Sequence, residues 1–390
     1  MRTMSRRVAG FGTTVFVEIN HLARQHNAVN LGQGAPDFDG PPEVLAAAVE
    51  AVNGALNQYA PGIGLPAARA AIAQHAERFY GQKLNAETDV LVTAGATEGI
   101  FAAILGLTDP GDEVIVFEPV YDTYVPNMVM AGVTPRYVPL RGDHWTFDPD
   151  ELSRAFTSRT RAIIVNTPHN PTGKVYTRVE LRAIADLCVK HNTVAITDEA
   201  YEHILYDDTV HARLATLPGM EDRTITISSL GKTFSVTGWK IGWAIGPSAL
   251  VNAVNQAHQF IIYAVASPLQ AAAATALNLP FSFFEQLQFD YQSRCDRLLN
   301  VLEKIGFKVF RPAGSYFIMI DWRGVAPAHV KDDFQFARWL TAEVGVACIP
   351  ISPFYQQADK HLGQHFARFA VCKRDETLAA AAERLSRLRP

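Results

Sequence analysis

The chain has 390 residues, of which 48% are hydrophobic and 19% are charged, and its net charge at pH 7 is −4. These values are typical of an ordered, soluble protein with a large core, and they exclude an intrinsically disordered chain. Because the charge is low and no run of basic residues occurs, we expect small-molecule partners and neither nucleic acid nor membrane binding.

Short apolar runs rich in β-branched residues alternate with helical periodicity between residues 89 and about 250. This alternation predicts an α/β fold in which helices cover a mostly parallel sheet. Ligands of such sheets bind beyond the carboxyl ends of the strands, so the residues that follow each strand should converge on one site. The predicted strands are residues 90–93, 113–117, 162–166, 194–197 and 224–228, with a differently oriented strand at 241–245.

The composition changes after residue 247, where alanine-rich and amphipathic helices are predicted near residues 271–277 and 283–305. Beyond them, the pattern predicts a smaller α+β domain. Its strands are expected at 308–310, 316–320, 346–349 and 366–371, and its helices near 332–343 and 376–388. We therefore expect a large domain, 46–282, and a small domain, 283–390, preceded by an amino-terminal segment, 1–45.

Residues with useful chemistry follow the first three predicted strands. The first strand runs through Ala96 and Thr97 into a helix whose exposed N–H groups suit a phosphate. Tyr121, after the second strand, can stack on a flat ring, although packing in the core would explain it equally well. After the third strand, proline-containing turns orient Asn170 as a hydrogen-bond donor, whereas His169 is assigned a structural role.

Asp198 directly follows the apolar fourth strand, so we expect its carboxylate to be buried and to need a cationic partner. A protonated pyridine nitrogen would serve. At an effective dielectric constant of about 20, opposite charges about 4 Å apart attract by roughly 4 kcal/mol, or about three pKa units. That attraction keeps a weakly basic ring nitrogen protonated at neutral pH, and the protonated ring withdraws electrons.

Lys232 follows the fifth strand in a turn that contains Gly231, and Ser229 and Lys240 lie close enough in the sequence to hold an anion. An isolated lysine between two strands is usually a surface residue. A lysine in a partly desolvated site near other positive charge, in contrast, loses its proton near neutral pH and can condense with an aldehyde. The neighbourhood of Lys232 favours such a Schiff-base lysine.

Together these motifs closely resemble the class I aminotransferases of fold type I, which depend on pyridoxal 5′-phosphate, and the resemblance covers nearly the whole chain. It is strongest with the branch that contains the kynurenine–oxoglutarate, glutamine and methionine aminotransferases and the N-succinyldiaminopimelate aminotransferases. The resemblance implies a seven-stranded sheet in a large, cofactor-binding domain. It rests on residues 30–37, 57–59, 170–171, 198–199, 228–243 and 367–369.

The resemblance also implies a role for each site residue. Lys232 forms the Schiff base and moves the α-proton, and Asp198 pairs with the pyridine nitrogen. Asn170 and Tyr201 hydrogen-bond the phenolic oxygen of the ring and stabilise its anion, and Tyr121 stacks on the ring. The phosphate is held by Ser229, Lys240, Ala96 and Thr97, together with Tyr59 from the neighbouring subunit, which implies a homodimer.

The substrate contacts follow from the same resemblance. Arg368 is implied to bind the α-carboxylate, because a guanidinium presents two parallel donors, and Asn170 is implied to contact the substrate as well. The amino-terminal segment 1–45 is implied to contribute to the small domain and the substrate mouth, and Gly34 lets it close over the substrate without a side chain in the way. Phe16, and Tyr263 from the partner subunit, correspond to aromatic pocket residues and favour an apolar or aromatic substrate side chain.

The implied reaction is ping-pong transfer of an α-amino group from a neutral, thioether or aromatic amino acid to a 2-oxo acid such as 2-oxoglutarate. N-succinyldiaminopimelate is an alternative donor, and cysteine-conjugate carbon–sulfur β-lysis is an alternative reaction that uses the same catalytic residues. Ala35 stands where this branch usually has phenylalanine, and Thr97 stands where the kynurenine enzymes have an aromatic residue. The donor therefore stays open.

Two other classes are disfavoured. A dinucleotide-binding dehydrogenase is rejected because the only Gly-x-Gly-x-x-Ala match, residues 62–67, follows no buried strand. A regulatory protein on the same scaffold would not need the complete catalytic set. The four cysteines are far apart in the sequence and form no Cys-x-x-Cys pair, which predicts neither a metal site nor a disulfide. Because no signal peptide or transmembrane segment is evident either, we expect the protein in the cytoplasm.

Overall fold

The computed structural model describes residues 3–388, so that residues 1–2 and 389–390, at the outer ends of the first and third expected parts, lie outside it. Its centre is a seven-stranded sheet with the strand order β2-β8-β7-β6-β5-β3-β4. Neighbouring strands are parallel, except that β8 runs antiparallel to both β2 and β7. The strands are β2 (Val90–Thr93), β3 (Glu113–Glu118), β4 (Thr134–Pro139), β5 (Thr160–Asn166), β6 (Val194–Asp198), β7 (Thr224–Ser229) and β8 (Gly242–Ile245). The mostly parallel seven-stranded α/β sheet is therefore confirmed.

β4 is a strand of this sheet that the sequence periodicity did not predict. It contains Pro135 and Pro139, and it pairs with β3 at the edge of the sheet. Proline has no backbone N–H to donate, and an edge strand tolerates it because such a strand has a neighbour on one side only. The prolines also interrupt the apolar pattern from which a strand is predicted. The differently oriented strand predicted at residues 241–245 is β8.

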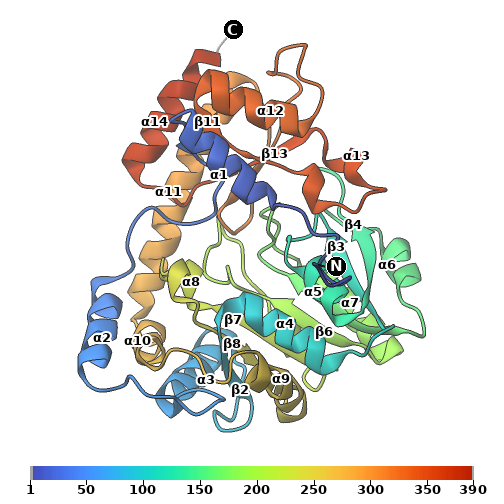
Figure 1. The fold of residues 1–390 in the computed structure, drawn as a ribbon, viewed down its shortest axis with the longest axis vertical. Helices are drawn as coiled ribbons and strands as arrows, with labels where there is room; N and C mark the ends of the chain where they lie inside the picture. Colours follow the sequence, from blue (N-terminus) through green and yellow to red (C-terminus); the bar gives the residue numbers. More distant parts are fainter. Residues whose placement is uncertain (1–2, 389–390) are drawn as a thin grey trace.

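Helices cover both faces of the sheet (Figure 1). Along β3, Val114 and Val116 belong to the core that contains α4, α5 and α9, whereas Ile115 and Phe117 belong to the core that contains α7. This alternation is the reason that β3 is apolar throughout. The helices of this part are α2 (Pro42–Asn53), α3 (Pro66–Tyr80), α4 (Gly95–Leu107), α5 (Tyr124–Ala131), α6 (Pro149–Ala155), α7 (Arg178–His191), α8 (Leu230–Thr233), α9 (Ser248–Ile261) and α10 (Ser267–Leu277).

The carboxyl-terminal part contains a four-stranded antiparallel sheet with the order β12-β13-β10-β9. The single strand predicted at residues 346–349 is in fact two short strands, because the chain changes partner at Cys348: β11 pairs with β1, and β12 pairs with β13. The elements are α11 (Phe281–Ile305), β9 (Lys308–Phe310), β10 (Phe317–Asp321), α12 (Asp333–Trp339), a π-helical turn (Leu340–Val344), β11 (Val346–Ala347), β12 (Ile349–Pro350), α13 (Lys360–Gly363), β13 (Phe366–Ala370) and α14 (Asp375–Leu385).

The beginning of the described chain packs on this carboxyl-terminal part. Helix α1 (Val15–Gln25) contacts α12, β11 and β12, and β1 (Val29–Asn30) pairs in parallel with β11. Figure 1 shows α1, in blue, beside the red and orange elements of the carboxyl terminus. The residues that follow β1 are consequently placed between the two sheets.

Two sequence expectations can be checked against the described residues. The four cysteines are buried and unpaired, as predicted from their spacing. Among residues 3–388, no helix has both the length and the apolar character needed to cross a bilayer.

Candidate active site

A cavity lies at the carboxyl ends of β5, β6 and β7. The residues predicted to contact the cofactor all line it, except Tyr59. The lining comes from segments that follow several different strands, and such convergence is expected beyond the carboxyl ends of parallel strands. The lining consists of Gly95, Ala96, Thr97, Ile100, Tyr121, Asn166, Asn170, Asp198, Ala200, Tyr201, Ser229, Gly231, Lys232, Thr237 and Lys240.

One end of the cavity is suited to an anion. Helix α4 begins there, and its first turn directs backbone N–H groups and partial positive charge toward the cavity. Lys240, in a left-handed conformation with φ 54°, places its Nζ 3.5 Å from Thr97 Oγ1. The backbone there is closely packed: a Cβ added to Gly242 would lie 2.8 Å from the nitrogen of Ala96. Ser229 completes this end and caps α8 by accepting a hydrogen bond from the Gly231 N–H.

Lys232 lies on α8, one turn beyond Ser229, and its Nζ donates a hydrogen bond to the carbonyl of Gly34 at 3.2 Å. Desolvation, together with the positive charges of Arg368 and Lys240, lowers the pKa of the Lys232 ammonium to about 8. An appreciable fraction of this amine is therefore unprotonated near neutral pH, as a nucleophilic lysine requires.

Asp198 is buried at the end of β6, and two strands, β8 and β7, separate it from β2 and the start of α4. Its Oδ2 accepts a hydrogen bond from the Tyr124 hydroxyl at 2.6 Å, and its Oδ1 accepts one from the backbone N–H of Ala200 at 3.2 Å. Burial raises the pKa of the carboxyl, while these hydrogen bonds and the charge of Lys232 oppose the rise. A carboxylate in this position is stabilised by a cationic ligand.

Sequence reasoning missed the positioning contacts of Tyr124 and Asn166. The Asn166 side chain donates to the carbonyl of Asp198 at 3.0 Å and accepts from the backbone N–H of Asn170 at 2.8 Å, so it links two neighbouring strand ends. Asn166 is the last residue of the predicted strand 162–166, and Tyr124 lies in the segment that follows the predicted strand 113–117. That position was the available signal, but the partner of a side chain cannot be read from its own segment.

Arg368 is buried in β13, and both of its hydrogen-bonded nitrogens contact uncharged oxygens. Nη1 donates to Asn170 Oδ1 at 2.7 Å, and Nη2 donates to the carbonyl of Gly32 at 2.9 Å. The remaining donor, Nε, is buried without a partner among residues 3–388. Burial lowers the pKa of the guanidinium to about 10, so it stays charged at neutral pH. Such a buried charge strongly favours an anionic ligand.

Gly34 and Phe16 come from the amino-terminal segment and lie near Arg368. A Cβ added to Gly34 would lie 2.7 Å from two ring atoms of Phe317, so a side chain at position 34 would collide. The ring of Phe16 lies 5.4 Å from the guanidinium carbon of Arg368, and the ring of Phe317 lies 3.9 Å from it. The predicted substrate residues of this segment are therefore brought next to the predicted carboxylate ligand.

Tyr59 and Tyr263 do not line the cavity of their own chain. Their side chains are 84% and 54% exposed, and their rings contact each other edge to face at 5.3 Å. The structure therefore brings these two predicted residues together on the surface, where a second chain can be reached. Exposed apolar neighbours surround them in the sequence, namely Leu56, Phe260, Ile261 and Ile262.

His169 is buried in the loop between Asn166 and Asn170, and its Nδ1 lies 2.8 Å from Thr172 Oγ1. Burial, reinforced by the charge of Lys174, lowers the pKa of the imidazole to about 3. His169 does not line the cavity, and its neutral ring is held within the protein. These contacts agree with the structural role expected from the sequence.

We expect His169 to make the folded protein sensitive to acid. Because its pKa falls from 6.5 to about 3 on folding, the unfolded state binds more protons between these pH values, and the free energy of unfolding rises with pH there. The loss from pH 7 to pH 5 should be about 2 kcal/mol for this one group. The free energy of unfolding, measured with urea at pH 7 and pH 5, should therefore change between these pH values by about 2 kcal/mol less in His169→Gln than in the wild type. Equal pH dependence in both proteins would contradict the buried neutral state.

Residues 26–385 match the sequence profile of the family described as aminotransferase class I and II. The chain is 47% identical to a probable N-succinyldiaminopimelate aminotransferase of Mycobacterium tuberculosis, with 97% of each chain covered. It is 38% identical to a methionine aminotransferase of Escherichia coli, with 97% of this chain and 96% of that protein covered.

Solved structures agree with these sequence relatives. An N-succinyldiaminopimelate aminotransferase from Mycobacterium tuberculosis superimposes with a TM-score of 0.95 at 47% identity, covering 99% of this chain and 100% of that one. An Escherichia coli protein with methionine aminotransferase function also gives a TM-score of 0.95, at 37% identity and with the same coverage. The chain therefore belongs to the class I and II aminotransferases of fold type I.

Proposed function

We propose that this aminotransferase binds pyridoxal 5′-phosphate in the cavity between Asp198 and Lys240. The observation that carries the proposal is the separation of charge along the sheet: the buried carboxylate of Asp198 ends β6, whereas Lys240 and the start of α4 adjoin β8 and β2, beyond β7 in the strand order. A pyridine nitrogen fits the carboxylate, and a phosphate fits the side of Lys240 and α4. Lys232, which follows the intervening strand β7, lines the same cavity and would supply the amine that condenses with the aldehyde.

When bound, this cofactor supplies an electron-withdrawing ring that stabilises the negative charge left after the substrate Cα loses its proton. The protein residues do the rest. Asp198, held by Tyr124, would keep the ring nitrogen protonated, and Tyr121 would pack against the ring. Asn170 and Tyr201 would hydrogen-bond the phenolic oxygen. Lys232 Nζ, whose pKa is about 8, would accept the proton from the substrate Cα and donate it again later in the reaction.

We infer that Arg368 binds the α-carboxylate of both the amino acid and the oxo acid. Its buried guanidinium contacts only neutral oxygens in the described chain, and its Nε lacks a partner there, so a carboxylate would supply the missing acceptor. Asn170 Oδ1 already accepts a hydrogen bond from Arg368 Nη1 at 2.7 Å, which fixes the orientation of the guanidinium. Charge-assisted, bidentate bonds of this kind are both strong and directional.

The proposed donor is a neutral, thioether or aromatic amino acid, and the proposed acceptor is a 2-oxo acid such as 2-oxoglutarate. The position of Phe16 beside Arg368 supports an apolar side chain, and the cations that line the described cavity are Lys232 and Lys240, which have other roles. The 47% identity to a probable N-succinyldiaminopimelate aminotransferase favours that compound as a second candidate. A carbon–sulfur β-lyase would use the same residues.

Single-donor reactions test these assignments. The purified enzyme with bound cofactor is mixed in turn with methionine, glutamine, phenylalanine, kynurenine, N-succinyldiaminopimelate and a cysteine S-conjugate, and the cofactor absorbance is followed while pyruvate is assayed. Conversion of the bound cofactor by the first four donors, without release of pyruvate, supports the proposal. Conversion by N-succinyldiaminopimelate alone would replace the proposed donor class. Pyruvate released from a cysteine conjugate without any acceptor would indicate the lyase, and an inert enzyme would refute the proposal.

We propose that the working unit is a homodimer in which Tyr59 and Tyr263 each complete the site of the other subunit. Both rings are exposed, adjacent to each other and outside the cavity of their own chain. Exposed aromatic and aliphatic side chains gathered in one place are typical of an interface.

A subunit-mixing experiment tests this arrangement. Lys232→Ala and Tyr59→Ala chains are co-expressed with different tags, and the mixed dimer is purified. If Tyr59 acts across the interface, one of the two sites in the mixed dimer is unaltered, and about half of the wild-type activity per dimer should return at a limiting cofactor concentration. Each parent dimer should be impaired under the same conditions. If Tyr59 acted within its own subunit, mixing would restore nothing.

A further inference from the structure

A buried ionic network lies directly behind the turn that carries Asp198 and Tyr201. Two carboxylates, those of Glu199 and Glu202, flank Tyr201 in the sequence, and Arg213 bridges them. Its Nε donates to Glu199 Oε2 at 2.9 Å, and its Nη2 donates to Glu202 Oε2 at 2.6 Å, with all three side chains at most 2% exposed. The guanidinium therefore joins the two ends of a turn whose middle residue faces the cavity.

The same network also holds β7, the strand that leads to Lys232. Ser228 Oγ donates to Glu202 Oε1 at 2.6 Å, so both oxygens of this carboxylate are engaged. Ser228 precedes Ser229, the predicted phosphate ligand, and α8 with Lys232 follows at once. Glu202 thus connects the turn of Tyr201 to the segment of Lys232.

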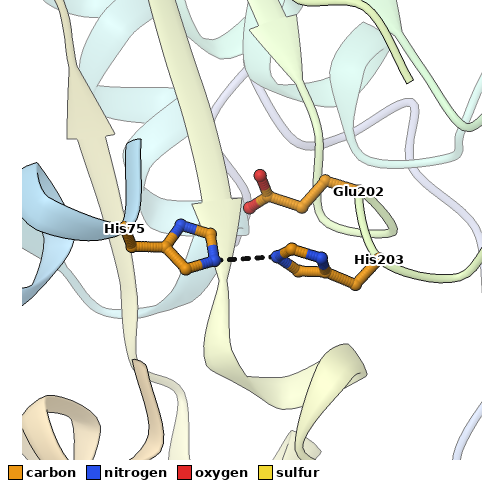
Figure 2. A group of neighbouring side chains, drawn as sticks. All are labelled: His75, Glu202 and His203. Atoms are coloured by element: carbon orange, nitrogen blue, oxygen red, sulfur yellow. Dashed lines mark hydrogen bonds between the residues drawn. The ribbon is translucent and has the colours of Figure 1, made fainter. Parts of the chain in front are cut away.

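A third side of the turn is held by a histidine pair, which Figure 2 shows next to the Glu202 carboxylate. His203 Nε2 lies 2.7 Å from His75 Nε2, and the ligand atoms of His75, Glu202 and His203 all lie within 4.8 Å of one another. Two nitrogens bound to one tetrahedral metal ion, with bonds of roughly 2.05 Å, would be about 3.3 Å apart. The shorter distance, and the two occupied oxygens of Glu202, identify a direct N–H···N hydrogen bond.

Both histidines of this pair are neutral. Burial lowers the pKa of His75 to about 4 and that of His203 well below 6.5, so one imidazole donates and the other accepts. Burial is the largest single influence on the Glu202 carboxyl and opposes its ionisation, but the surrounding groups together, the Arg213 charge first and also the Ser228 hydrogen bond, lower its pKa, which keeps the contact with Arg213 ionic. The turn is consequently fastened to α3, to β7 and to Arg213 by hydrogen bonds that water does not reach.

We propose that Glu202, held by Arg213 and Ser228, is a positioning residue that keeps the Tyr201 hydroxyl directed at the cofactor site beside Lys232. Tyr201 is buried, and Lys232 Nζ lies 5.5 Å from the centre of its ring. A small rotation of the turn would therefore change the position of the Tyr201 hydroxyl relative to Lys232 Nζ. The inference rests on the proposed function, in which Tyr201 stabilises the anionic oxygen of the ring and thereby favours loss of the proton from the cofactor-bound lysine.

The test is a double-mutant cycle read by the pH titration of the visible absorbance of the holoenzyme. Tyr201→Phe should raise the pKa of that titration, because the anionic oxygen loses a donor. Glu202→Gln keeps the size of the side chain but loses the charge that faces Arg213, and it should raise the pKa of the absorbance titration by about half a unit or more. In the Tyr201→Phe background, Glu202→Gln should add no further shift, because its effect passes through the missing hydroxyl.

Glu113→Gln is the matched control. Glu113 is also a buried carboxylate, bonded to Arg159 at 2.5 Å and to Thr157 at 2.6 Å, but it stands at the amino end of β3, away from the cavity. It should lower thermal stability and leave the absorbance titration unchanged. Arg213→Lys, which keeps the charge and loses the fork, is the second variant if Glu202→Gln does not fold, and its titration should shift in the same direction.

The outcomes separate this inference from the function on which it rests. A shift in Tyr201→Phe without one in Glu202→Gln or Arg213→Lys overturns the positioning role alone. An equal shift from Glu202→Gln in both backgrounds also overturns it, because the effect would not depend on Tyr201. If Tyr201→Phe leaves the titration unchanged, the role proposed for Tyr201 is wrong and the positioning role falls with it.

Discussion

Replacing Lys232 with alanine is expected to lower kcat by about 10⁴-fold or more and to abolish the visible absorbance of the cofactor–lysine linkage. Lys232 lines the cavity, and its pKa of about 8 lets its amine both take up and release a proton near neutral pH. Lys240 cannot replace it, because its Nζ lies at the anion end, next to Thr97. Steady-state rates and absorbance spectra of the purified variant measure both effects.

Two further lysine variants show whether the loss of activity in Lys232→Ala comes from the missing amine. Lys232→Arg keeps the positive charge but offers no amine for condensation, so it should lose activity as completely as Lys232→Ala. Lys190→Ala removes an exposed lysine of α7 and should change nothing. Wild-type turnover in Lys232→Ala would remove the central assignment of the site.

Replacing Arg368 with alanine is expected to raise the KM for the amino acid and for the oxo acid by about 100-fold or more. Two charge-assisted hydrogen bonds to the carboxylate are lost, whereas the contacts to the ring and the phosphate come from other segments. Cofactor affinity should therefore change far less than KM. Arg368→Lys, with a single point charge in place of the fork, should recover only part of the loss.

The control for Arg368 separates carboxylate binding from damage to the fold. Arg311→Ala removes an exposed arginine that pairs with Asp207 and Asp296, and it should leave KM unchanged. A primary amine without a carboxylate should react equally slowly with wild type and with Arg368→Ala, because neither enzyme can use the missing group. An unchanged KM for amino acids would show that the carboxylate is held elsewhere.

The strand-end residues were predictable because chain order and spatial order coincide in a parallel sheet. Asn170, Asp198 and Lys232 each follow an apolar strand, and the carboxyl ends of neighbouring parallel strands meet at one edge. Edge strand β4 was missed because its prolines hide the periodicity, and the strand near residue 348 was misjudged because the chain changes partner there. Both errors concern pairing, which depends on residues distant in the sequence.

Local sequence therefore sufficed for the reaction class, since the residues proposed to contact the cofactor lie in short motifs, each carried by a single turn. The partners of those residues depended on tertiary packing. Tyr124 reaches Asp198 across 74 residues, Arg368 reaches Asn170 across 198, and His75 reaches His203 across 128. No local pattern encodes such contacts, because they arise only when separate elements bury their surfaces against one another. The environment created by that burial lowers the pKa of Lys232, keeps the histidine pair neutral and leaves the Arg368 guanidinium hydrogen-bonded only to neutral oxygens among residues 3–388.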